Sequence, residues 1–95
     1  MAVEQRPDKA NWSYNLGLAY FDKGDLPKAE ESYKRAIEAD STCDKAWFAL
    51  ATVQMKMDFH SQGMVSLMKA LEIDPNNADY HNSIGIAYTD LGAPD

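Results

Sequence analysis

The sequence predicts an all-α fold of five helices, built from a helix–turn–helix unit that recurs every 34 residues. Residues 17–24 and 85–92 share five of eight residues at an offset of 68, which is twice 34. Residues 34–40 and 68–74 share Ala, Glu and Asp at matching places, at an offset of 34. Two segment pairs that agree on one period indicate duplication of a two-helix unit.

Length, charge and cysteine content narrow the class of protein. A chain of 95 residues forms one small domain at most. The net charge of −6 argues against nucleic acid or an anionic membrane as a partner. No apolar run approaches the roughly 18 residues of a membrane span, and the N-terminus lacks the apolar core of a secretion signal. Cys43 stands alone, so the sequence predicts a reducing, cytoplasmic location.

The first helix is predicted to follow a lead-in of residues 1–8. Asp8 is its predicted N-cap, and the helix runs to Lys23. Apolar residues recur at spacings of three and four, as in an amphipathic helix. They are Trp12, Leu16, Ala19 and Tyr20. Gly24 provides the left-handed residue that ends such a helix without steric cost.

The second helix is predicted to start after Asp25, which can cap it, and to run to about Ala39. Pro27 is tolerated in its first turn. Its predicted buried stripe is Ala29, Tyr33, Ala36 and Ile37. Ser41 and Thr42 then break the pattern, and their side-chain oxygens are candidate caps for the third helix.

The third and fourth helices are predicted at residues 44–57 and 61–73. Asp58 stands where the first unit has Gly24, and Asp tolerates a left-handed backbone, so we expect that conformation at Asp58. Gly63 stands inside the fourth helix, where a glycine costs about 1 kcal/mol relative to alanine. We therefore expect two helices to approach most closely at Gly63.

The fifth helix is predicted at residues 78–91, after a turn in which Pro75 stops the fourth helix and an asparagine caps the fifth. The chain then reaches residues 92–95, where the other units begin their second helix. The predicted organisation is a lead-in at 1–8, one unit at 9–43, a second unit at 44–77, and the first helix of a third unit at 78–95. This last helix is either a cap or the start of a truncated unit.

The residues at repeated positions resemble those of the tetratricopeptide repeat (TPR) family. The matches are Leu16, Gly17, Tyr20, Gly24, Ala29, Tyr33 and Ala36 in the first unit, Trp47, Leu50, Ala51, Ala70 and Pro75 in the second, and Ile84, Gly85 and Tyr88 in the last. The departures are Ser13 and His81 in the Trp position, Ser41 for Pro, Gln54 for Tyr, Leu67 for the aromatic residue and Gly63 for Ala. The resemblance implies a right-handed superhelical solenoid of antiparallel helix pairs, about two and a half units long, with a concave inner face.

The resemblance also implies which residues line that inner face. They are Asn11, Tyr14, Leu18, Phe21, Lys45, Phe48, Thr52, Met55, Asn82, Ile86 and Thr89. Large apolar and aromatic side chains dominate this set, which is typical of a groove that binds a partner. The resemblance therefore implies that the groove binds an apolar peptide or an amphipathic helix. The alternative is that some of these side chains belong to the core.

One branch of the family binds chaperone C-termini through basic and asparagine side chains on the inner face. This sequence has Tyr14, Leu18, Ala49, Asp79 and Ser83 at those places. Lys45 is the only cation expected on the inner face, and it is not at a clamp position. The sequence therefore argues against a chaperone tail as the partner.

Residues that could support catalysis are isolated. Cys43, His60 and His81 have no metal-ligand spacing, and there is no glycine-rich phosphate loop. We interpret His81 as packed against the preceding turn, and the acidic residues as solvated helix faces. These acidic residues are Glu30, Glu31, Glu38 and Glu72. The prediction is a protein–protein interaction module, part of a larger TPR protein, that is not an enzyme and needs no cofactor or metal.

An alternative function follows from the last predicted helix. In a full unit, Tyr88, Leu91 and their neighbours would pack against a sixth helix. One interpretation is that the chain is a fragment of a longer array. The other is that this apolar side pairs with a second copy, which would make the protein a self-assembly element.

Overall fold

The structure is a computed structural model and describes residues 7–90. Within that range it has five α-helices and no strand. They are α1 (Pro7–Lys23), α2 (Leu26–Ala39), α3 (Asp44–Lys56), α4 (His60–Ile73) and α5 (Ala78–Asp90). The predicted all-α fold is therefore confirmed. Leu91, which was predicted to end the fifth helix, lies outside the described residues.

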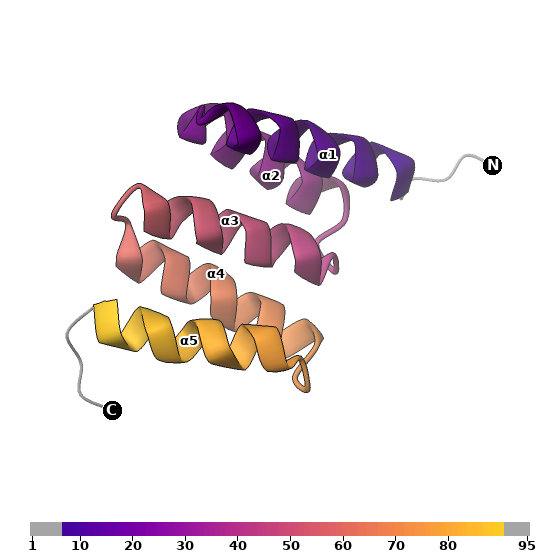
Figure 1. Cartoon of the computed structure of the whole chain (residues 1–95). Coiled ribbons are helices and arrows are strands. Elements are labelled where there is room, and N and C mark those ends of the chain that lie inside the picture. The colour runs from indigo at the N-terminus through magenta and orange to yellow at the C-terminus, as the bar shows by residue number, and fades with distance from the viewer. Residues whose placement is uncertain (1–6, 91–95) are drawn as a thin grey trace.

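The helices stack in chain order, and each one packs against the next (Figure 1). Figure 1 shows α1, α3 and α5 running in one direction, while α2 and α4 run in the opposite direction. This is the arrangement of a helical solenoid, in which each two-helix unit contacts only its neighbours.

Turn residues end and start the helices as their chemistry predicts. Gly24 has a φ of 84° and Asp58 a φ of 69°, so both take the left-handed conformation expected of them. The Asp25 carboxylate accepts a hydrogen bond from the backbone N–H of Lys28 at 3.4 Å and so caps α2. Asn77 caps α5 in the same way.

Three predicted helix starts are wrong in detail. Helix α1 begins at Pro7, so Asp8 lies in its first turn and is not its N-cap. Cys43 precedes α3 and makes no side-chain cap. The Thr42 hydroxyl and backbone N–H both donate to the Asp40 carboxylate, at 2.6 and 3.1 Å, so Thr42 stabilises its own turn and does not cap α3. Helix α4 begins one residue earlier than predicted, at His60.

The core consists of two clusters of buried side chains, one on each side of α3. The first joins α2 to α3 and consists of Ala29, Tyr33, Leu50 and Val53. The second joins α3, α4 and α5 and consists of Ala51, Leu67, Ala70 and Tyr80. A Cβ atom at Gly63 would lie 2.7 Å from Met55 Cγ and 3.1 Å from the Ala51 carbonyl oxygen. The predicted close approach of α3 and α4 at Gly63 is therefore confirmed.

Asp58 provides a test of the turn between α3 and α4. A non-glycine residue in the left-handed region is strained by about 1 kcal/mol, and glycine removes that strain. We expect Asp58→Gly to raise the midpoint of thermal unfolding by roughly 4–8 °C. The ion pair lost with Asp58, to His60 at 3.5 Å, is exposed and contributes little. Gly24→Asp is the reciprocal variant and should lower the midpoint; a decrease with Asp58→Gly would contradict this interpretation.

Candidate partner-binding surface

The predicted inner face is formed by side chains of α1, α3 and α5. Its members differ in exposure. Asn11, Leu18, Lys45, Asn82, Ile86 and Thr89 are exposed, and Tyr14, Phe21, Phe48, Thr52 and Met55 are half-buried. Two large apolar side chains stand out, because Leu18 is 39% exposed and Ile86 is 55% exposed. We refer to these eleven residues as the inner face.

Four inner-face side chains also take part in the core. The Tyr14 ring lies 5.9 Å from the Tyr33 ring, and the Phe48 ring lies 4.8 Å from the Tyr80 ring. Phe21 and Met55 pack against the first and second core clusters, respectively. Each of these side chains therefore has one side in the core and the other at the surface, so the alternative that some of the predicted residues belong to the core holds for them.

Side chains of adjacent units meet on this face. The Lys56 ammonium of α3 lies 5.9 Å from the centre of the Phe21 ring of α1, at a cation–π distance. Lys45 is therefore not the only cation beside the inner face, as the sequence predicted. Phe48 and Tyr80 make the corresponding contact between α3 and α5. The three helices thus offer one continuous surface.

Tyr80 and Asp44 form a link between α5 and α3 that the sequence analysis did not find. The buried Tyr80 hydroxyl donates to the Asp44 carboxylate at 2.7 Å. Burial, and secondly this hydrogen bond, raise the pKa of Tyr80 above its ordinary value. Burial, followed by the neighbouring Cys43 and Asp44, raises the pKa of Tyr14. A signal was present, because Tyr80 stands 34 residues after Ala46, which is buried against α2.

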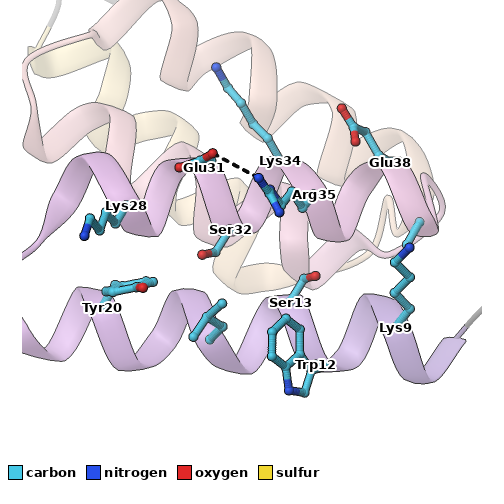
Figure 2. A pocket seen from close by; sticks show the side chains of 12 residues that line it. Lys9, Trp12, Ser13, Tyr20, Lys28, Glu31, Ser32, Lys34, Arg35 and Glu38 are labelled. Carbon is cyan, nitrogen blue, oxygen red and sulfur yellow. Dashed lines mark hydrogen bonds and ion pairs between the residues drawn. The ribbon is translucent and has the colours of Figure 1, made fainter.

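A second hollow lies between α1 and α2 and has a volume of about 960 Å³. Figure 2 shows Ser13 of α1 and Ser32 of α2 pointing toward each other across it, with Tyr20 and Trp12 on the α1 side. No residue of the predicted inner face lines this hollow. We call it the end groove, and its lining is Lys9, Trp12, Ser13, Leu16, Tyr20, Lys28, Glu31, Ser32, Lys34, Arg35, Glu38 and Ala39.

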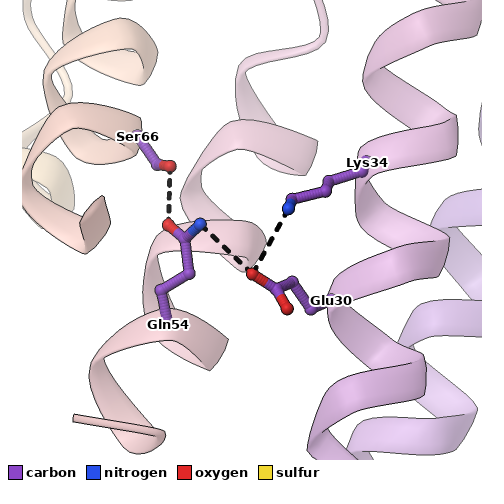
Figure 3. Close-up of polar contacts among 4 residues, drawn as sticks. All are labelled: Glu30, Lys34, Gln54 and Ser66. Atoms are coloured by element: carbon purple, nitrogen blue, oxygen red, sulfur yellow. Dashed lines mark hydrogen bonds and ion pairs between the residues drawn. The ribbon is translucent and has the colours of Figure 1, made fainter. Parts of the chain in front are cut away.

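The interpretation of the acidic residues as solvated is correct for three of the four. Glu31 pairs with Arg35 at 3.2 Å on an exposed surface, and Glu38 and Glu72 are exposed. Glu30 differs, because its side chain is mostly buried between helices. Its carboxylate pairs with Lys34 at 3.5 Å and accepts a hydrogen bond from Gln54 at 3.5 Å (Figure 3).

The histidine and metal predictions were also examined in the structure. His81 Nε2 lies 2.7 Å from the Pro75 carbonyl oxygen, which confirms that His81 packs against the turn before α5. Between residues 7 and 90, no three His, Cys, Asp or Glu side chains gather as a metal site would require. In the same range, no helix has both the length and the apolar character needed to cross a membrane.

Comparisons with known proteins identify the family. Two family models, both described as tetratricopeptide repeat, match residues 10–43 and 44–77. Among curated proteins, "Protein CTR9 homolog" of Arabidopsis thaliana is 32% identical over 90% of this chain and 8% of its own length. The "Peroxisomal targeting signal receptor" of Komagataella phaffii is 30% identical over 84% of this chain and 14% of its own length.

The solved structures agree. The crystal structure of MamA superposes with a TM-score of 0.87 and 27% sequence identity, over 93% of this chain and 52% of that chain. The chain thus spans about half of MamA and a small fraction of both curated relatives. With both repeats matched in register, the chain belongs to the tetratricopeptide repeat family.

Proposed function

We propose that this protein–protein interaction module binds an apolar peptide or an amphipathic helix of its partner on the inner face. The observation that carries this proposal is the exposure of Leu18 and Ile86. They stand at the same place in the first and last units, 68 residues apart, with Thr52 at that place between them. Exposed large apolar side chains on a continuous surface favour a partner-binding site.

The half-buried aromatic residues support the proposal from a different direction. Tyr14, Phe21 and Phe48 are held by core contacts, so a partner that packs on their outer sides need not order them. The name of the peroxisomal relative describes a receptor for a targeting signal. Recognition of a segment of another protein is therefore the function that we propose for this chain.

The test uses Leu18 and Ile86, because Phe21→Ala or Phe48→Ala would also disturb the core. Peptides selected from a display library against the whole chain would be titrated into Leu18→Ser and Ile86→Ser. We expect about tenfold weaker binding for each variant, because each loses an apolar contact of roughly 1–2 kcal/mol.

The matched control is Val65→Ser. Val65 is 57% exposed and belongs to α4, outside the inner face. It should leave the affinity unchanged. Selected peptides that bind the Leu18 and Ile86 variants as tightly as the original chain would show that the inner face is not the binding site.

A second candidate function, self-assembly through α5, is favoured by the side of α5 that carries Gly85 and Tyr88. Tyr88 is exposed, and no heavy atom lies within 4 Å of a Cβ built at Gly85. Light scattering over a concentration range separates the two functions. A constant monomer mass favours the module, whereas growth in mass that Tyr88→Ser abolishes favours assembly.

A further inference from the structure

The end groove exposes residues whose counterparts are buried in the other two units. Trp12 is 65% exposed, whereas Ala46 and Tyr80, which follow it by 34 and 68 residues, are 0% and 4% exposed. Ala19 is likewise exposed, although its counterpart Val53 is completely buried. The side of α1 that borders the end groove is thus one that the repeat covers wherever a preceding helix exists.

A helix provides that cover in the second and third units. Val53 and Leu50 of α3 pack with Tyr33 of α2 in the first core cluster. Tyr80 of α5 packs with Leu67 of α4 in the second. The shape that fits the corresponding side of α1 is therefore an α-helix with apolar residues facing the groove.

The second unit also indicates the polar chemistry of such a helix. Gln54 and Ser66 are the counterparts of Tyr20 and Ser32, which line the end groove. The Ser66 hydroxyl donates to Gln54 Oε1 at 2.8 Å, and Gln54 Nε2 donates to the Glu30 carboxylate of α2 at 3.5 Å (Figure 3). The covering helix α2 thus presents a carboxylate to this polar pair. In the end groove, the Tyr20 and Ser32 hydroxyls offer donors at the equivalent place.

The charge of the end groove points to the same chemistry. Its lining contains four basic residues and two acidic ones, although the whole chain carries a net charge of −6. The basic residues are Lys9, Lys28, Lys34 and Arg35, and the acidic ones are Glu31 and Glu38. The Lys28 ammonium lies 5.7 Å from the centre of the Tyr20 ring, beside the predicted place of the carboxylate. A basic surface on an acidic protein favours an acidic partner.

We propose that the end groove binds one acidic amphipathic helix of a partner protein. The helix lays apolar side chains on Trp12 and Leu16. It directs carboxylates toward Tyr20, Ser32 and the basic rim. This site is separate from the inner face and does not depend on the function proposed for that face.

Three helical peptides test the proposal, each cross-linked on its outward side. The parent peptide is residues 26–39, the α2 sequence, because α2 covers the equivalent side of α3. The acidic peptide carries Lys28→Glu, Lys34→Glu and Arg35→Glu. The basic peptide carries Glu30→Lys, Glu31→Lys and Glu38→Lys. All three keep the same apolar residues, so only charge differs among them.

Each peptide would be titrated into the whole 95-residue chain by fluorescence anisotropy. We expect the acidic peptide to bind at least tenfold more tightly than the basic one, with an advantage that shrinks as salt is added. Trp12→Ala should weaken binding of the acidic peptide by about tenfold or more, because exposed tryptophans often dominate binding energy. Ile86→Ser on the inner face should leave it unchanged. Circular dichroism of Trp12→Ala confirms that the fold is retained.

Several results would overturn the proposal. Equal affinities for the acidic and basic peptides would remove its charge argument, and binding unaffected by Trp12→Ala would place the peptide elsewhere. Self-association of the chain that Trp12→Ala abolishes would assign the groove to a second copy. A longer natural form of the chain that no longer binds the acidic peptide would assign it to the same polypeptide. Failure of the Leu18 and Ile86 experiment alone would leave the end groove unaffected.

Discussion

Gly17→Ala is expected to lower the free energy of unfolding by about 1–3 kcal/mol. A Cβ atom at Gly17 would lie 2.4 Å from Cε1 and 2.6 Å from Cδ1 of Tyr33. Tyr33 is completely buried and also packs against Tyr14, so its ring has no space into which to move. The resulting overlap outweighs the gain in helix propensity of about 1 kcal/mol that alanine brings.

Gly85→Ala is the matched control, since Gly85 occupies the same place in the third unit. No heavy atom lies within 4 Å of a Cβ at Gly85, so the propensity gain should appear alone and raise the free energy of unfolding by about 1 kcal/mol. Urea unfolding followed by circular dichroism gives both values. Stabilisation of the chain by Gly17→Ala would show that α1 and α2 do not approach each other as described.

The second large effect is expected at Gln54, where a buried polar chain joins α2, α3 and α4. Gln54→Met keeps the size of the side chain and removes its hydrogen bonds to Ser66 and Glu30 (Figure 3). Ser66 is buried, so its hydroxyl loses its acceptor without access to water. We expect the free energy of unfolding to fall by about 1–3 kcal/mol.

Two further variants make this result specific. Adding Ser66→Ala to Gln54→Met removes the stranded hydroxyl and should recover part of the loss, because replacing both partners costs less than replacing one. Gln62→Met, on an exposed position of α4, should change stability by less than about 0.5 kcal/mol. A double variant less stable than Gln54→Met would contradict the hydrogen-bonded role of Gln54.

Local chemistry made most of the fold predictable. The 34-residue period defined five helices, and turn residues such as Gly24, Asp58 and Asn77 marked their ends correctly. Gly63 was identified because a glycine inside a helix is costly unless a neighbour comes close. The error at Thr42 arose because several side chains in one turn compete for the same backbone groups, and sequence does not show which of them succeeds.

Contacts between distant residues were not predictable. Glu30 and Gln54 are 24 residues apart, and Asp44 and Tyr80 are 36 apart, so their pairing depends on how the units stack. The register of the repeat placed Leu18 and Ile86 on the inner face. The half-burial of Phe48 depends on the Tyr80 ring of the next unit, which no pattern within its own helix indicates.

The central claim is that the first helices of the units, α1, α3 and α5, present the surface that binds a partner peptide. Amide chemical shifts of the ¹⁵N-labelled chain, recorded while a display-selected peptide is added, test it most directly. We predict that the largest changes fall on α1, α3 and α5, around Leu18, Thr52 and Ile86. Changes confined to α2 and α4 would contradict the claim.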